Sequence, residues 1–185
     1  STGYTTNNNT SRTLAAAVYQ QIIADLKAAQ TDLVDDFSFS NGERIRPNRG
    51  AATALLARVY LYLQDWPNAA TQASNLIENS STYGLDTDLD SVFLANSREA
   101  IWQLEPVLPG YNTSEGSLFI LTTVPSYYAL NKSLVSAFET DDLRRRHWVD
   151  SLVVGTNTDD YPFKYKIRAG ATITEVSMVF RLAEQ

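Results

Sequence analysis

The sequence predicts a mainly α-helical protein whose helical hairpins carry a loop-rich part with short strands. Apolar residues recur every three or four positions near the start of the chain, and two closely spaced helical segments follow. After Tyr83-Gly84 the sequence becomes rich in Pro, Gly, Asn, Ser and Thr, which break regular structure. We expect one domain over residues 1–185, with helices in 11–80, a loop-rich part in 85–170 and the beginning of a helix in 176–185.

The first expected helix runs from about Ser11 to Val34 and follows a segment, residues 1–10, that is too polar to pack. Residues three and four positions apart share one face of a helix, so the apolar residues form a single stripe. Thr10 or Ser11 would cap the free N–H groups of the first turn. The stripe consists of Leu14, Val18, Ile22, Leu26, Ala29 and Leu33.

The next two helices, at about 47–63 and 66–79, predict an antiparallel hairpin. A proline suits the first turn of each, Pro47 in one and Pro67 in the other, because the missing N–H has no helical partner there. The pattern of alanines and aromatic residues over 51–77 is close to a tetratricopeptide unit, which must stack on a neighbouring helix to bury its apolar face. Large aromatic residues within the helical period are expected in the core: Tyr60, Tyr62 and Trp66.

The remainder of the chain predicts short elements. Residues 132–140 predict a helix, and Asp141 or Asp142 would cap a helical turn over 144–146. The apolar pattern of 176–185 is helix-like. Short strands are predicted at residues 100–104, 117–124 and 163–167.

Composition disfavours several classes of function. The net charge is −6, and the densest basic run, Arg144 to Arg146, directly follows Asp141-Asp142, so neither nucleic acid nor an anionic membrane surface is an expected partner. The chain has no cysteine and no apolar run near the ~20 residues of a membrane span. Its eight glycines are scattered and form no phosphate-binding or dinucleotide fingerprint, so the sequence predicts no cofactor.

Catalytic and metal-binding interpretations are weak. His147 is the only histidine and lies beside arginines, which favours a structural or solvent-facing role. The run Asp86-x-Asp88-x-Asp90 resembles a calcium loop but lacks the following glycine and the terminal glutamate. The other acid pairs, Asp35-Asp36, Asp141-Asp142 and Asp159-Asp160, are typical of caps and turns rather than of glycosidase carboxylates, and Arg181 and Glu184 would pair along a helix.

Aromatic residues in the loops indicate a binding site instead. Sugar rings present flat C–H faces that stack on aromatic rings, while their hydroxyls need amides, acids or arginines nearby. Loops on a rigid scaffold are where binding residues concentrate. The candidate ligand-binding residues are Tyr111, Asn112, Tyr127 and Tyr128.

An ordered set of segments resembles the SusD/RagB family of nutrient-binding proteins. Residues 18–26 (VYQQIIADL) and 49–62 (RGAATALLARVYLY) are similar to two of its helices, the second to the pattern GAAxALLARVYLY. Leu143 departs from the usual proline of the family's DPR motif. The other matching segments are residues 64–66, 99–102, 134–144, 163–165 and 180–184.

The resemblance implies a non-catalytic protein with a tetratricopeptide-like scaffold and loops that bind oligosaccharides or polysaccharides. It implies a lipoprotein on the outer-membrane surface of a Gram-negative bacterium, with a TonB-dependent, SusC-like transporter as partner. It also implies that this chain lacks parts at both ends, including the lipid-attached cysteine. The alternative is a tetratricopeptide-like scaffold that binds another protein and has no sugar affinity.

Overall fold

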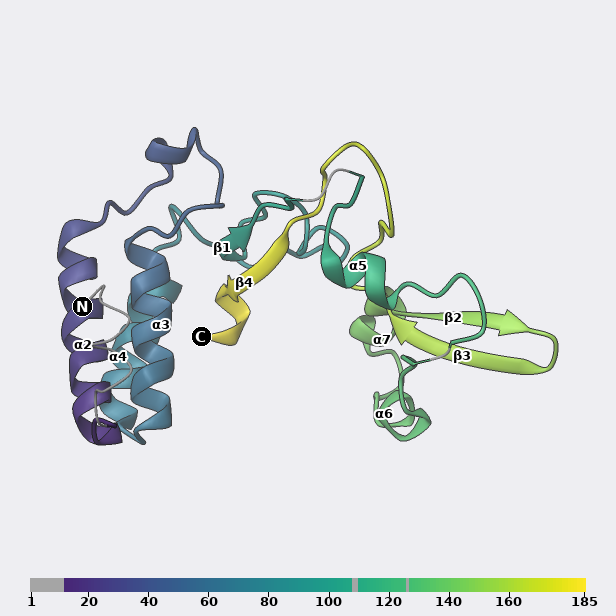
Figure 1. Cartoon of the computed structure of the whole chain (residues 1–185), viewed down its shortest axis with the longest axis horizontal. Helices are drawn as coiled ribbons and strands as arrows, with labels where there is room; N and C mark the ends of the chain where they lie inside the picture. The colour runs from purple at the N-terminus through teal and green to yellow at the C-terminus, as the bar shows by residue number, and fades with distance from the viewer. Residues whose placement is uncertain (1–11, 108–109, 126) are drawn as a thin grey trace.

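Three helices packed side by side form one end of the molecule (Figure 1). The computed structural model describes residues 12–107, 110–125 and 127–185. Within them α2 spans Ala15–Asp32, α3 spans Arg49–Tyr62 and α4 spans Trp66–Ile77. None of the helices in these ranges is both long and apolar enough to cross a membrane.

The helix boundaries follow from local capping. Asn48 accepts a hydrogen bond from the Ala51 N–H at 3.0 Å, so α3 begins after it and Pro47 lies outside the helix, contrary to prediction. Asp65 caps α4, and Pro67 occupies its first turn as predicted. Helix α2 begins after Leu14 without a side-chain cap. The predicted caps Thr10 and Ser11 lie outside the described residues.

The main part of the core lies between the helices and two short strands that contain Ile101 and Phe180. A smaller cluster joins Leu56, Tyr60 and Ala69 to the half-buried Ile23 and Leu26 of α2. The main cluster consists of Phe37, Ala51, Ala54, Leu76, Tyr83, Ile101, Phe180 and Leu182.

Two of the aromatic residues expected in the core are exposed. Tyr60 is buried as predicted, but the side chains of Tyr62 and Trp66 are 67% and 57% exposed. Both lie at the tip of the hairpin, at the end of α3 and the start of α4, where no described element covers them. Their prediction as core residues was wrong because helical spacing alone does not say which positions find a neighbour.

Strands β1 (Ala100–Leu104) and β4 (Ser177–Arg181) form an antiparallel pair next to the helices (Figure 1). The predicted helix over 176–185 is therefore wrong, and only the 3-10 turn η2 (Leu182–Glu184) is helical. The backbone of β4 finds hydrogen-bond partners in β1, a strand distant in sequence, and this outweighs its local helical pattern.

This pairing also separates Arg181 from Glu184. Arg181 forms an ion pair with Glu99 at 3.4 Å, and Glu184 forms one with Arg58 of α3 at 3.3 Å. The predicted pair between the two residues is replaced because a strand does not place positions i and i+3 on one face.

The loop-rich part holds three short helices: α5 (Ser114–Phe119), α6 (Lys132–Ser136) and α7 (Leu143–Trp148). The cap of α7 by Asp142 is confirmed, and α6 is shorter than predicted. The predicted strand at 117–124 is wrong, because Thr113 accepts a hydrogen bond from the Gly116 N–H at 2.9 Å and thereby starts α5.

A second antiparallel pair, β2 (Val149–Val154) and β3 (Asn157–Pro162), projects from the end of the molecule that lies away from the three helices (Figure 1). Gly155, at a φ of 62°, makes the tight turn between them. The sequence did not predict this hairpin, and the strand predicted at 163–167 is wrong because the extended chain pairs just before it. Of the described residues, 39% are in helices and 14% in strands, which confirms the mainly α class with short strands in a loop-rich part.

Candidate functional site

Two adjacent tyrosines stand out from the surface of the loop-rich part. The side chains of Tyr127 and Tyr128 are 89% and 49% exposed, and their ring centroids lie 6.3 Å apart with the planes at 51°. Phe119 of α5 packs edge-on against Tyr128, with centroids 5.7 Å apart, and so supports that ring from below. The pair therefore offers two ring faces to solvent, one of them held by a neighbour.

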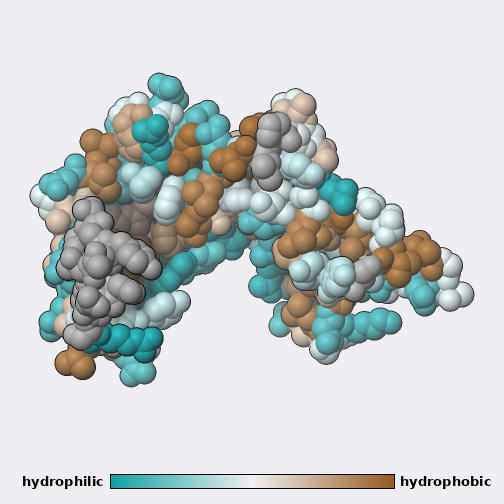
Figure 2. All heavy atoms as spheres, viewed as in Figure 1, coloured by the Kyte–Doolittle hydropathy of each residue, from teal (hydrophilic) through white to brown (hydrophobic). Residues whose placement is uncertain are grey.

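These rings border a hollow of about 290 Å³, here called the tyrosine hollow. Two further apolar side chains in it, Leu118 and Val124, are about half exposed. Figure 2 shows apolar surface gathered over the part of the molecule that carries α5 and the β2–β3 hairpin. The lining residues are Ser117, Leu118, Ile120, Leu121, Thr122, Thr123, Val124, Pro125, Tyr127, Tyr128 and Arg168.

A close backbone contact joins α5 to the segment that supplies Arg168. A Cβ atom on Gly116 would stand 2.4 Å from the Ile167 carbonyl oxygen, so only glycine permits this approach. The next residue along the chain is Arg168, which reaches the hollow. The position of Arg168 thus depends on how α5 packs.

Asn112 organises this region from inside and does not face the hollow. Its side chain is 0% exposed, and its Oδ1 accepts the N–H groups of Thr174 at 2.7 Å and Glu175 at 3.0 Å. Its Nδ2 donates to the Thr172 carbonyl at 3.0 Å. The structure therefore places Asn112, predicted to contact a ligand, inside the fold, where its amide oxygen and one of its N–H groups already have partners.

Glu175 continues the network toward Arg168. Its buried carboxylate accepts the N–H of Lys166 at 2.6 Å and that of Ile167 at 3.1 Å. On the other side of Arg168, the Gly170 N–H donates to the Gly110 carbonyl at 2.9 Å. The turn that carries Arg168 is therefore fixed on both sides.

The structure brings together two of the four predicted residues. Tyr127 and Tyr128 share the tyrosine hollow, whereas Tyr111 is exposed but does not line it. Arg168 was not predicted, because it lies far from the tyrosines along the chain and has no local motif around it. Only the fold joins them.

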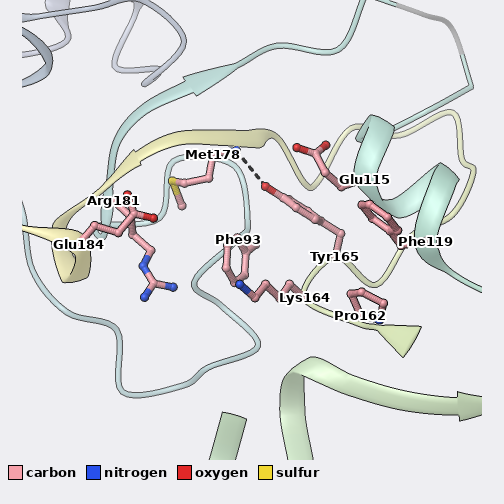
Figure 3. A pocket seen from close by; sticks show the side chains of 9 residues that line it. All are labelled: Phe93, Glu115, Phe119, Pro162, Lys164, Tyr165, Met178, Arg181 and Glu184. Atoms are coloured by element: carbon pink, nitrogen blue, oxygen red, sulfur yellow. Dashed lines mark hydrogen bonds between the residues drawn. The ribbon is translucent and has the colours of Figure 1, made fainter. Parts of the chain in front are cut away.

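A second cavity, of about 380 Å³, is lined in part by Glu115 and Phe119 of α5 (Figure 3). Figure 3 shows Lys164 beside the Phe93 ring and the Tyr165 hydroxyl accepting a hydrogen bond from the Met178 N–H, at 2.9 Å. Burial raises the pKa of Tyr165 to about 12. Burial, and to a smaller extent nearby Arg181, lowers the pKa of Lys164.

Two cations lie near the Phe93 ring of this second cavity and near the adjacent Trp148 ring. The Lys164 ammonium lies 5.6 Å from the Phe93 ring centroid and 5.4 Å from that of Trp148. The Arg181 guanidinium lies 5.8 Å and 5.3 Å from the same rings. A neighbouring cavity of about 720 Å³ shares Lys164 and Arg181. Because the rings of Phe93 and Trp148 already have cations beside them, whereas Tyr127 and Tyr128 are open to solvent, the tyrosine hollow is the stronger candidate.

The three aspartates of the calcium-like run do not converge on one point. Asp86 accepts a hydrogen bond from the Ser97 hydroxyl at 2.6 Å, while Asp90 pairs with His147 and with Lys166, both at 2.9 Å. These two partners, Lys166 first, lower the pKa of Asp90. Asp88, Asp90 and His147 lie close enough together to share an ion, but the Lys166 ammonium already provides positive charge there. The cluster connects α7, which carries His147, to the loop that carries Asp88 and Asp90.

Comparisons with known proteins agree with this architecture. Residues 1–61 match the profile of a family described as starch-binding and associating with the outer membrane. Over 88 residues the chain is 38% identical to SusD-like protein P2 of Formosa agariphila, which covers 46% of this chain and 17% of that protein.

Two solved structures share the fold. A SusD superfamily protein from Bacteroides vulgatus superposes with a TM-score of 0.72 at 25% identity, over 95% of this chain and 41% of that one. Surface glycan-binding protein A from Bacteroides uniformis has a TM-score of 0.68 at 17% identity, over 92% of this chain and 43% of its own. The chain thus spans less than half the length of these relatives. The sequence match over residues 1–61 and the shared fold over nearly the whole chain confirm the predicted resemblance: the chain is similar to proteins of the SusD/RagB family.

Proposed function

We propose that this chain binds carbohydrate, an oligosaccharide or polysaccharide, through the tyrosine hollow and without breaking bonds. The observation that carries the proposal is the exposed pair Tyr127 and Tyr128, two ring faces 6.3 Å apart in a hollow that also offers the threonines 122 and 123. Apolar ring faces beside hydroxyl groups suit the amphipathic surface of a pyranose. Of the described residues that line the hollow, none is a carboxylate or a histidine, so it offers no acid–base pair for hydrolysis.

The proposed site assigns different roles to the two parts of the chain. We propose that residues 11–80 form the helical frame and residues 85–170 the glycan-binding part of a single domain over 1–185. The pair β1–β4 connects the two, because its residues Ile101 and Phe180 belong to the same core as α3. Binding residues then stand on loops that a rigid scaffold positions.

The resemblance to the SusD/RagB family supports a wider proposal for the whole protein. We propose that it is a lipoprotein on the outer-membrane surface of a Gram-negative bacterium and that it delivers glycan to a TonB-dependent, SusC-like transporter. The matching family is described as associating with the outer membrane.

The test is a titration of the chain with a panel of soluble polysaccharides and oligosaccharides, read by calorimetry or affinity electrophoresis. Ligand must reach millimolar concentration, because a dissociation constant of 1 mM corresponds to only about −4.1 kcal/mol. We expect saturable binding to one glycan class that Tyr127→Ala and Tyr128→Ala each weaken about tenfold. Tyr62→Ala, an exposed tyrosine on the helical frame, should change nothing. An unaltered affinity in the Tyr127 and Tyr128 variants would reject this site.

A second candidate function has its own observation. A groove of about 290 Å³ between α3 and α4 is lined by small alanines, by Leu61 and by the exposed Trp66. Such a groove suits an amphipathic helix of a protein partner. A chain that binds helical peptides, loses them on Trp66→Ala and binds no glycan would favour this protein-binding scaffold.

A further inference from the structure

The charge of the tyrosine hollow is unbalanced. Eleven described residues line it, and Arg168 is the one charged residue in that set. Its neighbours are apolar side chains, two tyrosines and hydroxyl-bearing residues. A ligand in this hollow therefore meets a single positive charge beside two aromatic faces.

The guanidinium of Arg168 is not engaged elsewhere in the described part of the chain. The ion pairs found there use Arg49, Arg58, Arg144, Arg145 and Arg181, together with Lys166 and His147, and never Arg168. A free arginine on an ordinary surface would simply be hydrated. Arg168 differs because hydrogen bonds on either side of it hold its backbone in place without a ligand.

That positioning comes from three independent contacts. Glu175 accepts the N–H of the preceding residue, Ile167, at 3.1 Å. The Ile167 carbonyl lies against Gly116 of α5, where a side chain could not fit. Gly170, two residues after Arg168, donates to the Gly110 carbonyl at 2.9 Å. A side chain that projects from a fixed backbone loses less freedom on binding than one on a mobile loop.

We propose that the hollow selects glycans that carry an acidic group, a uronic carboxylate or a sulfate ester, and that Arg168 pairs with that group. The inference rests on the proposed function and adds the chemical class of the ligand. The planar guanidinium donates two parallel N–H bonds to a carboxylate or to two sulfate oxygens, which a neutral hydroxyl cannot match. Tyr127 and Tyr128 then take the ring of the acidic sugar or of its neighbour.

The experiment uses matched ligand pairs. The chain is titrated with an oligogalacturonate and with the same oligomer after its carboxylates have been reduced to alcohols. A sulfated galactan oligosaccharide and its desulfated form make the second pair. We expect an acidic member to bind about tenfold more tightly than its neutral counterpart, and the two pairs show whether the group is a carboxylate or a sulfate. The preference should shrink as salt rises, because the pair is open to solvent.

Variants identify the group responsible. Arg168→Gln should abolish the preference and leave the affinity for the neutral oligomers unchanged, while Arg168→Lys should retain part of it. Arg46→Gln, which removes an equally exposed charge from the helical end, controls for net charge and should keep the preference. Equal affinity for acidic and neutral ligands in the unmodified chain, or a preference that survives Arg168→Gln, would overturn the inference and leave carbohydrate binding intact. Absence of binding to all four ligands at millimolar concentration, together with saturable binding of a neutral glycan from the wider panel, would overturn the inference alone, whereas absence of binding to the whole panel would overturn the proposed site as well.

Discussion

The hydroxyl of Tyr83 lies against the backbone of Gly50, so that a Cβ atom on Gly50 would stand 2.0 Å from the oxygen and 2.8 Å from the ring carbon that bears it. Gly50 is in the first turn of α3, and Tyr83 follows α4. The same hydroxyl accepts a hydrogen bond from Asn48, the residue that caps α3, at 2.9 Å. One buried tyrosine thus joins the start of the hairpin to the chain that leaves it.

We predict that Gly50→Ala destabilises the protein by about 2 kcal/mol or more, because an overpacked core must shift buried atoms. Urea unfolding measures the change. Gly170→Ala is the matched control: the added Cβ would have only ordinary contacts, the closest at 3.5 Å, and should cost little. Equal stability of the two variants would show that the contact at Tyr83 is not as tight as described.

Arg44 is a buried cation without a carboxylate partner among the described residues. It donates to the carbonyls of Ala100 at 2.6 Å and Thr82 at 2.7 Å, and stacks on Phe37 at 4.7 Å. Burial lowers the pKa of Arg44. The two carbonyls and the Phe37 ring hold the guanidinium in its buried position.

Arg44→Met should therefore cost about 3 kcal/mol, since two charge-assisted hydrogen bonds disappear and the buried carbonyl of Ala100 and the partly buried carbonyl of Thr82 lose their donor. Arg144→Met removes an exposed ion pair with Asp142 and should cost far less, because solvent screens such pairs. Denaturant midpoints compare the two. A smaller loss of stability for Arg44→Met than for Arg144→Met would contradict the stabilising role of the buried Arg44.

Asn112→Ala should destabilise the chain by about 2 kcal/mol, because the N–H groups of Thr174 and Glu175 lose a buried acceptor. Thermal unfolding should show a melting temperature several degrees lower. Asn131→Ala, which removes only the exposed cap of α6, should have about half that effect. A ligand-contact role would predict the reverse pattern: intact stability and weaker glycan binding.

Ionisation of Tyr161 should make the stability of the protein depend on pH in the alkaline range. Burial, then its hydrogen bond to Asp150 at 2.8 Å, raises the pKa of Tyr161 to about 12, against about 10 in the unfolded chain. A raised pKa means that the folded state keeps the proton longer. This contribution to stability is therefore complete below pH 10 and is lost as pH rises from about 10 to about 12.

The measurement is the free energy of unfolding at a series of alkaline pH values for the unmodified chain and for Tyr161→Phe. The unmodified chain should lose stability more steeply across this window. Parallel curves would mean that Tyr161 ionises alike in the folded and unfolded states.

Phe119 should matter to binding without touching the ligand. Its edge supports the ring of Tyr128, so Phe119→Ala should weaken glycan affinity about threefold by loosening that ring. In the Tyr128→Ala background the same change should have almost no effect, and calorimetry of the four proteins tests this. Additive losses would show that Phe119 acts on its own.

How far the sequence predicted the structure depends on the range of the interactions. The helices at 15–32, 49–62 and 66–77 follow from local period and capping residues such as Asp65, and they were predicted. Strand β4 was missed because its hydrogen-bond partners belong to β1, far back in the chain. Local pattern cannot supply that information.

The same limit applies to the candidate site. Tyr127 and Tyr128 were predicted because they are adjacent aromatic residues in a loop. Asn112 has equally loop-like neighbours, but its partners Thr172 and Thr174 lie some sixty positions on, and they turn it inward. Arg168 enters the hollow only through the contact of Ile167 with Gly116. Which polar residues face a ligand was decided by tertiary contacts.

The pairing of Trp102 in β1 with Phe180 in β4 has a consequence for how this protein could be re-engineered. The long excursion of the chain between these strands leaves the helical frame and returns to it at one point. Its ends are therefore spaced as the two ends of a hairpin are, whatever lies between them. A different excursion could be grafted onto the same two strands, and the recognition surface exchanged as a cassette while the helices stay unchanged.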